Sequence, residues 1–127
     1  MELVVECKKN VNVIIDPMRF EQVIFNLLDN AIKYSDPNTK TSISVKSENG
    51  MVLLIIKDEG YGIPKEDLSY IFDRFYRVDK SRSRDTGGSG LGLSIVKELI
   101  EAHDGTIEIK SEQGKGTAFY ISLKELP

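Results

Sequence analysis

Cysteine and histidine are each present only once, as Cys7 and His103, in this chain of 127 residues. One thiol and one imidazole cannot form an internal disulfide, a multi-cysteine zinc site or a Cys-His catalytic pair within one chain. An excess of positive charge is also lacking, because 17 basic residues face 20 acidic ones and the formal net charge is −3. A chain with this balance has no general attraction for phosphate backbones, so we expect no nucleic-acid partner.

Long apolar runs are missing as well. The longest run is Met51–Ile56, far below the roughly 20 residues that a membrane-spanning helix needs. The N-terminal residues Met1–Cys7 contain no basic region followed by an apolar stretch and a cleavage site, so they do not form a secretory signal. From the sequence we therefore expect no membrane span and a cytosolic chain.

The sequence has the composition of one globular domain, 1–127, with 40% hydrophobic and 29% charged residues. Asp16 and Pro17 are typical of a helix start, and the apolar period that follows predicts a helix from Pro17 to about Tyr34. A short helix is predicted near 65–71 and a longer one from about Leu91 to Ala102. About three helices are therefore expected on one mixed sheet, in a two-layer α/β sandwich.

The strands of this sheet are predicted from alternating or continuous apolar residues. The segment 51–57 is predicted to be buried on both faces, and Glu48-Asn49-Gly50 is predicted to form the hairpin turn before it. The remaining extended segments are Leu3–Val5, Asn12–Ile15, Thr41–Lys46, Thr106–Lys110 and Thr117–Leu123.

Three polar segments are candidates for a binding site. Asn26, Asn30 and Lys33 share one side of the first long helix, beside its apolar face. Asp58 follows a predicted strand and opens a loop with alternate glycines, and a second such loop, Gly88–Gly92, precedes a helix start, where free N–H groups favour phosphate. Taken singly, these are also compatible with a solvated helix flank and two glycine-rich turns.

Together, the segments resemble the catalytic and ATP-binding domain of sensor histidine kinases, within the superfamily that includes gyrase, the Hsp90 chaperone and the MutL repair protein. Residues 20–35, FEQVIFNLLDNAIKYS, resemble the N box, and Asp58–Gly62 resembles the G1 box. Residues 71–77, IFDRFYR, resemble the F box, and Gly88–Leu93 resembles the G2 box. The order, spacing and flanks of the four boxes agree over essentially the whole chain. The resemblance implies the Bergerat-type ATP-binding fold.

The resemblance also implies ATP and Mg²⁺ as ligands and a role for each matching residue. Asn30 would supply an amide oxygen to Mg²⁺, and Asn26 would assist near the ion or the phosphates. Lys33 and Arg77 would face phosphate oxygens, so that Asn26, Lys33 and Arg77 form the catalytic set. Asp58 would accept a hydrogen bond from the adenine amino group and disfavour GTP. The other implied nucleotide-binding positions are Tyr34, Gly60, Gly62, Ile63, Phe75, Gly88, Gly90, Leu91, Gly92 and Leu93.

The segment of about 77–90, between the F and G2 boxes, would be the ATP lid, which we expect to be mobile without nucleotide. It carries the cations Arg77, Lys80, Arg82 and Arg84, whose alternative interpretation is a solvated loop.

Hydrolysis of ATP by this chain alone is disfavoured by Asn26. Hydrolysing relatives such as gyrase have a glutamate at this position as the general base, and an amide cannot take a proton at neutral pH. We therefore expect phosphoryl transfer to a protein group, which the resemblance implies is a histidine on a separate helical dimerisation domain. His103 lies near the end of a predicted helix and is interpreted as structural, so the chain would be inactive without that domain.

The resemblance further implies a parent sensor kinase that is a membrane-anchored homodimer and acts on a response regulator, whereas the chain itself is expected to be a monomer. Two alternatives are a nucleotide-sensing or protein-docking module without phosphotransfer and a standalone ATPase.

Overall fold

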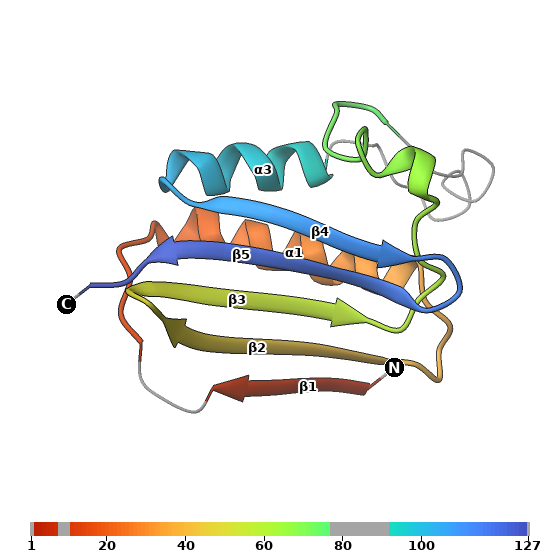
Figure 1. The fold of residues 1–127 in the computed structure, drawn as a ribbon, viewed down its shortest axis with the longest axis horizontal. Coiled ribbons are helices and arrows are strands. Elements are labelled where there is room, and N and C mark those ends of the chain that lie inside the picture. The colour runs from red at the N-terminus through yellow and green to blue at the C-terminus, as the bar shows by residue number, and fades with distance from the viewer. Residues whose placement is uncertain (1, 8–10, 77–91, 127) are drawn as a thin grey trace.

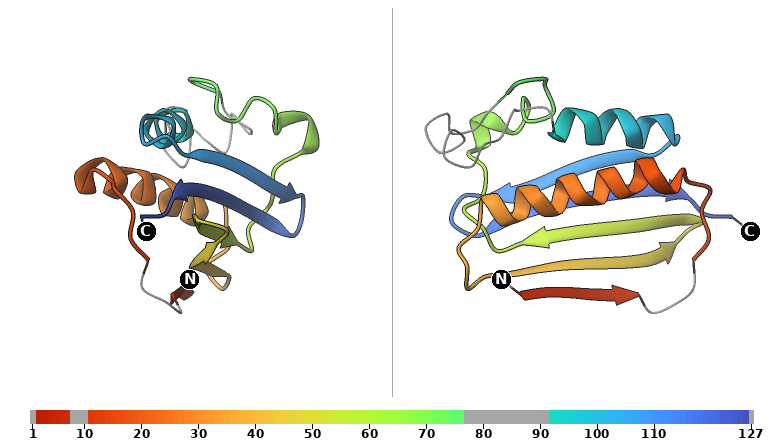
Figure 2. Two further views of the ribbon diagram at one scale, coloured as in Figure 1. Left: turned by 60° about the vertical axis from the view of Figure 1, so that its left-hand side comes forward. Right: turned by 180° about the vertical axis from the view of Figure 1, so that it is seen from behind.

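The structure is a computed structural model, and it describes residues 2–7, 11–76 and 92–126. Five strands in these ranges form one mixed sheet in the order β1-β2-β3-β5-β4 (Figure 1). Figure 2 shows that the two α-helices of these ranges, α1 (Pro17–Lys33) and α3 (Gly92–Ala102), lie on the same face of this sheet. The predicted two-layer α/β sandwich is therefore confirmed.

The sheet is antiparallel except at its β1 edge, where β1 runs parallel to β2. Asn49 and Gly50, between β2 and β3, both have positive φ, as a tight hairpin turn requires, which confirms the predicted turn. The strands are β1 (Glu2–Cys7), β2 (Lys40–Glu48), β3 (Met51–Asp58), β4 (Thr106–Glu112) and β5 (Gly116–Lys124).

Strand β3 differs from its prediction, because only one of its faces is buried. Val52, Leu54 and Ile56 are buried on the face that the helices cover, but Lys57 on the opposite face is exposed. The expectation of two buried faces was wrong because the described helices form a single layer, which leaves the other face of the sheet without a cover.

Helix α1 (Pro17–Lys33) begins at Asp16, whose Oδ1 accepts hydrogen bonds from the backbone N–H groups of Met18 and Arg19. Its apolar face is buried through Val23, Leu27 and Ala31, as its period predicts. Helix α3 (Gly92–Ala102) lies beside α1 and runs in the opposite direction (Figure 1). No helix in the described ranges is both long and apolar enough to cross a bilayer.

The predicted short helix near 65–71 is only one turn of 3₁₀-helix, η1 (Lys65–Asp67). The described residues therefore contain two α-helices, where about three were expected. The backbone N–H groups of Asp67, Leu68 and Tyr70 each donate to the carbonyl oxygen three residues earlier, which is the pattern of 3₁₀ turns and not of an α-helix.

The expected extended segment 12–15 does not pair with the sheet. The chain leaves β1 here and crosses to the helix layer, while Val13 and Ile15 pack against the core. The carbonyl of Asn12 accepts the N–H of Leu126, so this connection is held by the C-terminal segment instead of a strand partner.

Candidate nucleotide-binding site

Most of the predicted site residues that the structure describes lie on, or directly after, three elements that end or begin close together, and Phe75 lies in a separate segment. The three elements are the last turns of α1, the end of β3 and the start of α3, which meet at the right-hand side of Figure 1. Residues 58 and 92 are 34 positions apart in the chain, so the fold and not the sequence brings these segments to one place.

Asp58 is the last residue of β3 and is only 8% exposed. Its Oδ1 accepts two backbone hydrogen bonds, from Gly60 N–H at 2.8 Å and from Thr117 N–H at 3.3 Å. Neither of these donors uses Oδ2, which leaves acceptor capacity at that oxygen. The carboxylate is therefore fixed in orientation and can accept a hydrogen bond from a ligand.

Two opposing effects act on the pKa of the Asp58 carboxyl. Burial raises the pKa of the Asp58 carboxyl above its ordinary value, and the hydrogen bonds from the Gly60 and Thr117 N–H groups lower it by less than burial raises it. Two backbone hydrogen bonds do not fully replace the hydration that this carboxylate loses by burial. A hydrogen bond from a ligand donor therefore stabilises it more than the same bond would stabilise an exposed carboxylate.

Gly60 is packed so closely against the end of α1 that no other residue fits at this position. A Cβ atom at this residue would lie 2.3 Å from the carbonyl oxygen of Tyr34 and 2.6 Å from Ser35 Oγ. The same loop is tied to the end of α1, because Tyr61 N–H donates to the Tyr34 carbonyl. Gly60 thus allows the loop after β3 to approach the C-terminus of α1 closely.

Gly60→Ala is expected to destabilise the domain by about 3 kcal/mol, because its Cβ would clash with the backbone carbonyl oxygen of Tyr34 and with the side-chain oxygens of Ser35 and Asp58. Gly114→Ala is the matched control: its Cβ meets no atom within 4 Å, and only its φ of +85° opposes a side chain. A loss of about 1 kcal/mol is expected there. Urea unfolding of both variants tests this, and equal losses would show that close approach at Gly60 does not matter.

Two hydroxyl residues on the β4–β5 hairpin also belong to this site, and sequence reasoning missed them. Ser111 Oγ lies 2.8 Å from Thr117 Oγ1 and accepts the N–H of Ile63 at 2.7 Å. Ile63, a predicted binding residue, is thereby held with its side chain in the core. No local pattern in the sequence singles out either residue. In the structure, Gly116 directly before Thr117 has a φ of +134°, and a Cβ at this position would lie 2.1 Å from the Asp58 carbonyl oxygen.

Ser35 adds a polar atom without a partner. Among the residues that the structure describes, its Oγ is a buried side-chain atom with no hydrogen-bond partner. It lies near Asp58, since the point that a Gly60 Cβ would occupy is 2.6 Å from Ser35 Oγ and 2.8 Å from Asp58 Oδ1. A buried hydroxyl without a partner is costly, so this position favours a polar ligand atom or a bound water.

Asn26, Asn30 and Lys33 lie on α1, and each is half-buried. Lys33 Nζ forms an ion pair with Asp29 Oδ2 at 3.0 Å, and both side chains are partly exposed. An ion pair of this kind contributes little, so the ammonium can turn to an incoming phosphate at small cost. The side chain of Asn26 reaches from α1 toward the start of α3, where its Oδ1 is 3.6 Å from the point that a Gly92 Cβ would occupy. Leu93, the next residue of α3, packs against the core.

Two aromatic residues of the F box differ in burial, because Phe75 is exposed and Tyr76 packs against the core. Phe75 is 69% exposed and has a φ of 64°, an uncommon conformation for an aromatic residue. Tyr76 packs against the core, and its hydroxyl donates to Asp67, which raises the pKa of Tyr76 to about 12. The implied role of Phe75 at the nucleotide stays a prediction. Arg77, Gly88, Gly90, Leu91 and the proposed lid lie outside the described residues.

Metal binding by carboxylates or soft ligands has no support in the described ranges, which contain no group of three or more His, Cys, Asp or Glu side chains able to hold an ion. The amide oxygen of Asn30 is a hard ligand of the kind that Mg²⁺ takes together with phosphate oxygens and water.

A family model described as "Histidine kinase-, DNA gyrase B-, and HSP90-like ATPase" matches residues 15–127. The chain belongs to this family. Within it, the chain is of the type of the sensor histidine kinase catalytic domains. It is 50% identical over 113 residues to the signal transduction histidine-protein kinase ArlS of Staphylococcus aureus strain USA300. That match covers 89% of this chain and 25% of ArlS, so the chain spans a quarter of the length of this relative.

Solved structures of the same type agree. The mycobacterial sensor histidine kinase MprB has a TM-score of 0.87 at 33% identity, covering 99% of this chain and 84% of that one. The catalytic domain of histidine kinase ThkA, in a nucleotide-free form, has a TM-score of 0.83 at 28% identity, covering 99% of this chain and 81% of that one. Full-length ShkA in complex with AMPPNP has a TM-score of 0.82 at 25% identity, covering 98% of this chain and 25% of that one.

Proposed function

We propose that this domain binds Mg-ATP at the ends of α1 and β3 and donates the γ-phosphoryl group to a histidine on a separate helical domain of its parent kinase. The observation that carries the proposal is the Asp58 carboxylate, which is buried and held by two backbone N–H groups beside a loop that Gly60 brings close to α1. Family membership makes ATP the expected nucleotide.

The base-binding part of the site has a hydrogen-bond pattern that suits adenine. Asp58 offers an acceptor to the amino group of adenine, whereas guanine presents a carbonyl oxygen at that position, and two acceptors repel each other. Ser35 Oγ lies near Asp58 and has no partner within the described part of the protein, so it can bind the base edge directly or through a water. The two side chains together support adenine over guanine.

The phosphate-binding part of the site is expected on α1 and at the start of α3. Asn30 would hold Mg²⁺ through its amide oxygen, and Asn26 and Lys33 would contact the phosphates. When bound, Mg²⁺ neutralises charge that develops on the phosphate oxygens. Lys33 supplies further positive charge after it leaves Asp29, and Arg77 is expected to do the same.

Transfer to a protein group is favoured over hydrolysis by Asn26. During transfer the bond between the γ-phosphorus and the bridging oxygen breaks, a phosphorus–nitrogen bond forms on the acceptor imidazole, and ADP leaves. The imidazole must lose its proton, and we expect the group that takes it to lie on the acceptor domain. Asn26 has no basic atom with which to activate water instead.

His103 cannot replace the acceptor histidine. Its Nδ1 and Nε2 are both used in hydrogen bonds within the domain, to Leu99 and Asp16. The acceptor therefore comes from another domain, which we place in a longer, dimeric and membrane-anchored parent kinase that acts on a response regulator. We propose that this chain by itself is a monomer in the cytosol.

The test supplies a purified acceptor domain together with radiolabelled ATP and Mg²⁺. We expect acid-labile, base-stable label on the acceptor histidine and very slow release of free phosphate without acceptor. ATP binding without any label on the acceptor would favour a nucleotide-sensing module. Rapid phosphate release without acceptor would favour a standalone ATPase.

A further inference from the structure

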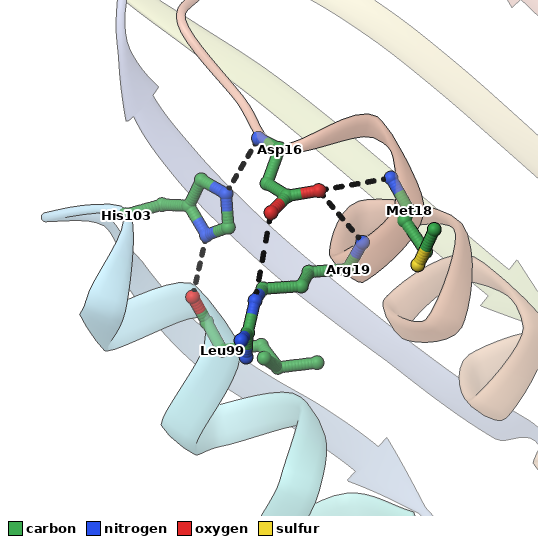
Figure 3. Close-up of polar contacts among 5 residues, drawn as sticks. All are labelled: Asp16, Met18, Arg19, Leu99 and His103. Atoms are coloured by element: carbon green, nitrogen blue, oxygen red, sulfur yellow. Dashed lines mark hydrogen bonds and ion pairs between the residues drawn. The ribbon is translucent and has the colours of Figure 1, made fainter.

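The side chain of His103 links the two helices of the domain (Figure 3). His103 follows the last turn of α3, and its Nδ1 lies 2.7 Å from the carbonyl oxygen of Leu99 in that helix. Its Nε2 accepts the backbone N–H of Asp16 at 3.0 Å, and Asp16 is the N-cap of α1. One imidazole therefore joins the end of α3 to the beginning of α1.

These two contacts determine the protonation state of the ring. A carbonyl oxygen can only accept, so Nδ1 carries a hydrogen, and a backbone N–H can only donate, so Nε2 carries none. The link therefore requires the neutral imidazole with its proton on Nδ1. The edge-to-face contact with Phe20, with ring centroids 6.0 Å apart, further restricts the ring.

The link lies at one end of an antiparallel helix pair, and the proposed phosphate site lies at the other. Asn26 faces the start of α3 at Gly92, while Asp16 faces its end at His103. The spacing of the two helices at the phosphates thus depends on how they are joined at the opposite end, because each helix moves as a nearly rigid body.

We propose that His103 is a positioning residue of the nucleotide site: through its bond to the Asp16 N–H it holds α1 against α3, so that Asn26 and the start of α3 face the same phosphates. This inference rests on the proposed function, because it assumes that nucleotide binds between these two helices. His103 acts at a distance and does not touch the nucleotide.

Protonation of the ring removes the acceptor that the link needs. A hydrogen on Nε2 would point at the Asp16 N–H, and the imidazolium would be drawn to the Asp16 carboxylate, which already caps α1 and lies 3.5 Å from Arg19 Nε. The ionisable residues nearest to His103 along the chain are Glu101, in the last turn of α3, and Asp104, directly after His103.

The first arm of the test compares the full chain with His103→Ala and His103→Gln by calorimetric titration with Mg-ATP at about pH 8, well below each melting temperature. Loss of the link in His103→Ala is expected to weaken binding about fivefold. His103→Gln keeps a neutral acceptor for the Asp16 N–H and is expected to bind within about twofold of the wild type. A merely structural role would lower the melting temperature of His103→Ala and leave its affinity unchanged, and this result overturns the inference.

The second arm uses His103→Leu, whose side chain is apolar and offers the Asp16 N–H no acceptor. It is expected to bind Mg-ATP about fivefold more weakly than His103→Gln at the same pH. Equal affinities of these two variants overturn the inference, even where His103→Ala does not fold. If the wild type binds no ATP at about pH 8, the proposed function fails and this inference fails with it, whereas equal ATP affinities in all of these chains contradict this inference alone.

Discussion

Asp58→Asn is expected to lower the affinity for ATP on the order of 100-fold and to remove the preference for ATP over GTP. Because the Gly60 and Thr117 N–H groups both donate to Oδ1, the amide oxygen of the variant takes that position. The NH₂ group then takes the place of Oδ2 and presents a donor where adenine also presents a donor. Calorimetric titration with both nucleotides measures the change.

The same variant is expected to unfold at a higher temperature than the wild type at neutral pH without nucleotide. Burial holds the pKa of Asp58 above its ordinary value, so the folded state binds a proton more readily than the unfolded state does. The stability that this protonation supplies is present at low pH and is lost as the pH rises through the folded-state pKa. The neutral amide avoids that loss, and its advantage is expected to shrink as the pH is lowered toward 3.8, the ordinary value.

Thermal unfolding across this pH range, together with the titrations, separates ligand binding from folding. Weaker ATP binding in a variant of equal or higher stability places Asp58 in contact with the nucleotide. A variant that is less stable at neutral pH and loses affinity for ATP and GTP equally would contradict the role assigned to this carboxylate.

Asn30→Ala is expected to reduce phosphotransfer to a supplied acceptor domain on the order of 100-fold or more, because the loss of a Mg²⁺ ligand removes several kcal/mol of charge stabilisation. Binding of ATP in EDTA is expected to change by less than about threefold, since the base contacts at Asp58 are untouched. Radiolabel transfer and titration with and without Mg²⁺ measure the two effects.

Asn12→Ala is the matched control for Asn30→Ala, because Asn12 is exposed and precedes the first turn of α1, whereas Asn30 lies in the last turn of that helix. It is expected to transfer phosphate at the wild-type rate. If Asn30→Ala lost ATP binding to the same extent with and without Mg²⁺, its role would be in folding or in nucleotide contact and not in metal binding.

The elements of this fold could be predicted where local chemistry alone determines them. Asp16 and Pro17 placed the start of α1 at the correct residue, and the turn at Asn49-Gly50 was predicted because few other residues accept positive φ at both positions. The structures of segments 12–15 and 65–71 were predicted wrongly because they depend on tertiary packing. The first segment is hydrogen-bonded to the C-terminal segment instead of to a strand, and the second contains one 3₁₀ turn beside the core.

The candidate site was predictable in its residue types but not in its supports. Asp58, Gly60 and the amides of α1 lie in segments whose pattern matches the family. Thr117, which holds Asp58, is 59 residues away from it, and Ser111, which holds Ile63, is 48 residues away, and nothing in their local sequence points to β3. His103 was interpreted as structural from its place near a helix end, but its partner Asp16 is 87 residues away and could be found only from the fold.

The most direct test of the central claim is calorimetric titration of the wild-type chain with ATP and with GTP, each with and without Mg²⁺. The site described here predicts that ATP binds, that Mg²⁺ strengthens its binding, and that GTP does not match it. Absence of binding by either nucleotide, or equal binding of both, would contradict the assignment of Asp58 and its neighbours as an adenine site and would favour a protein-docking role for the domain.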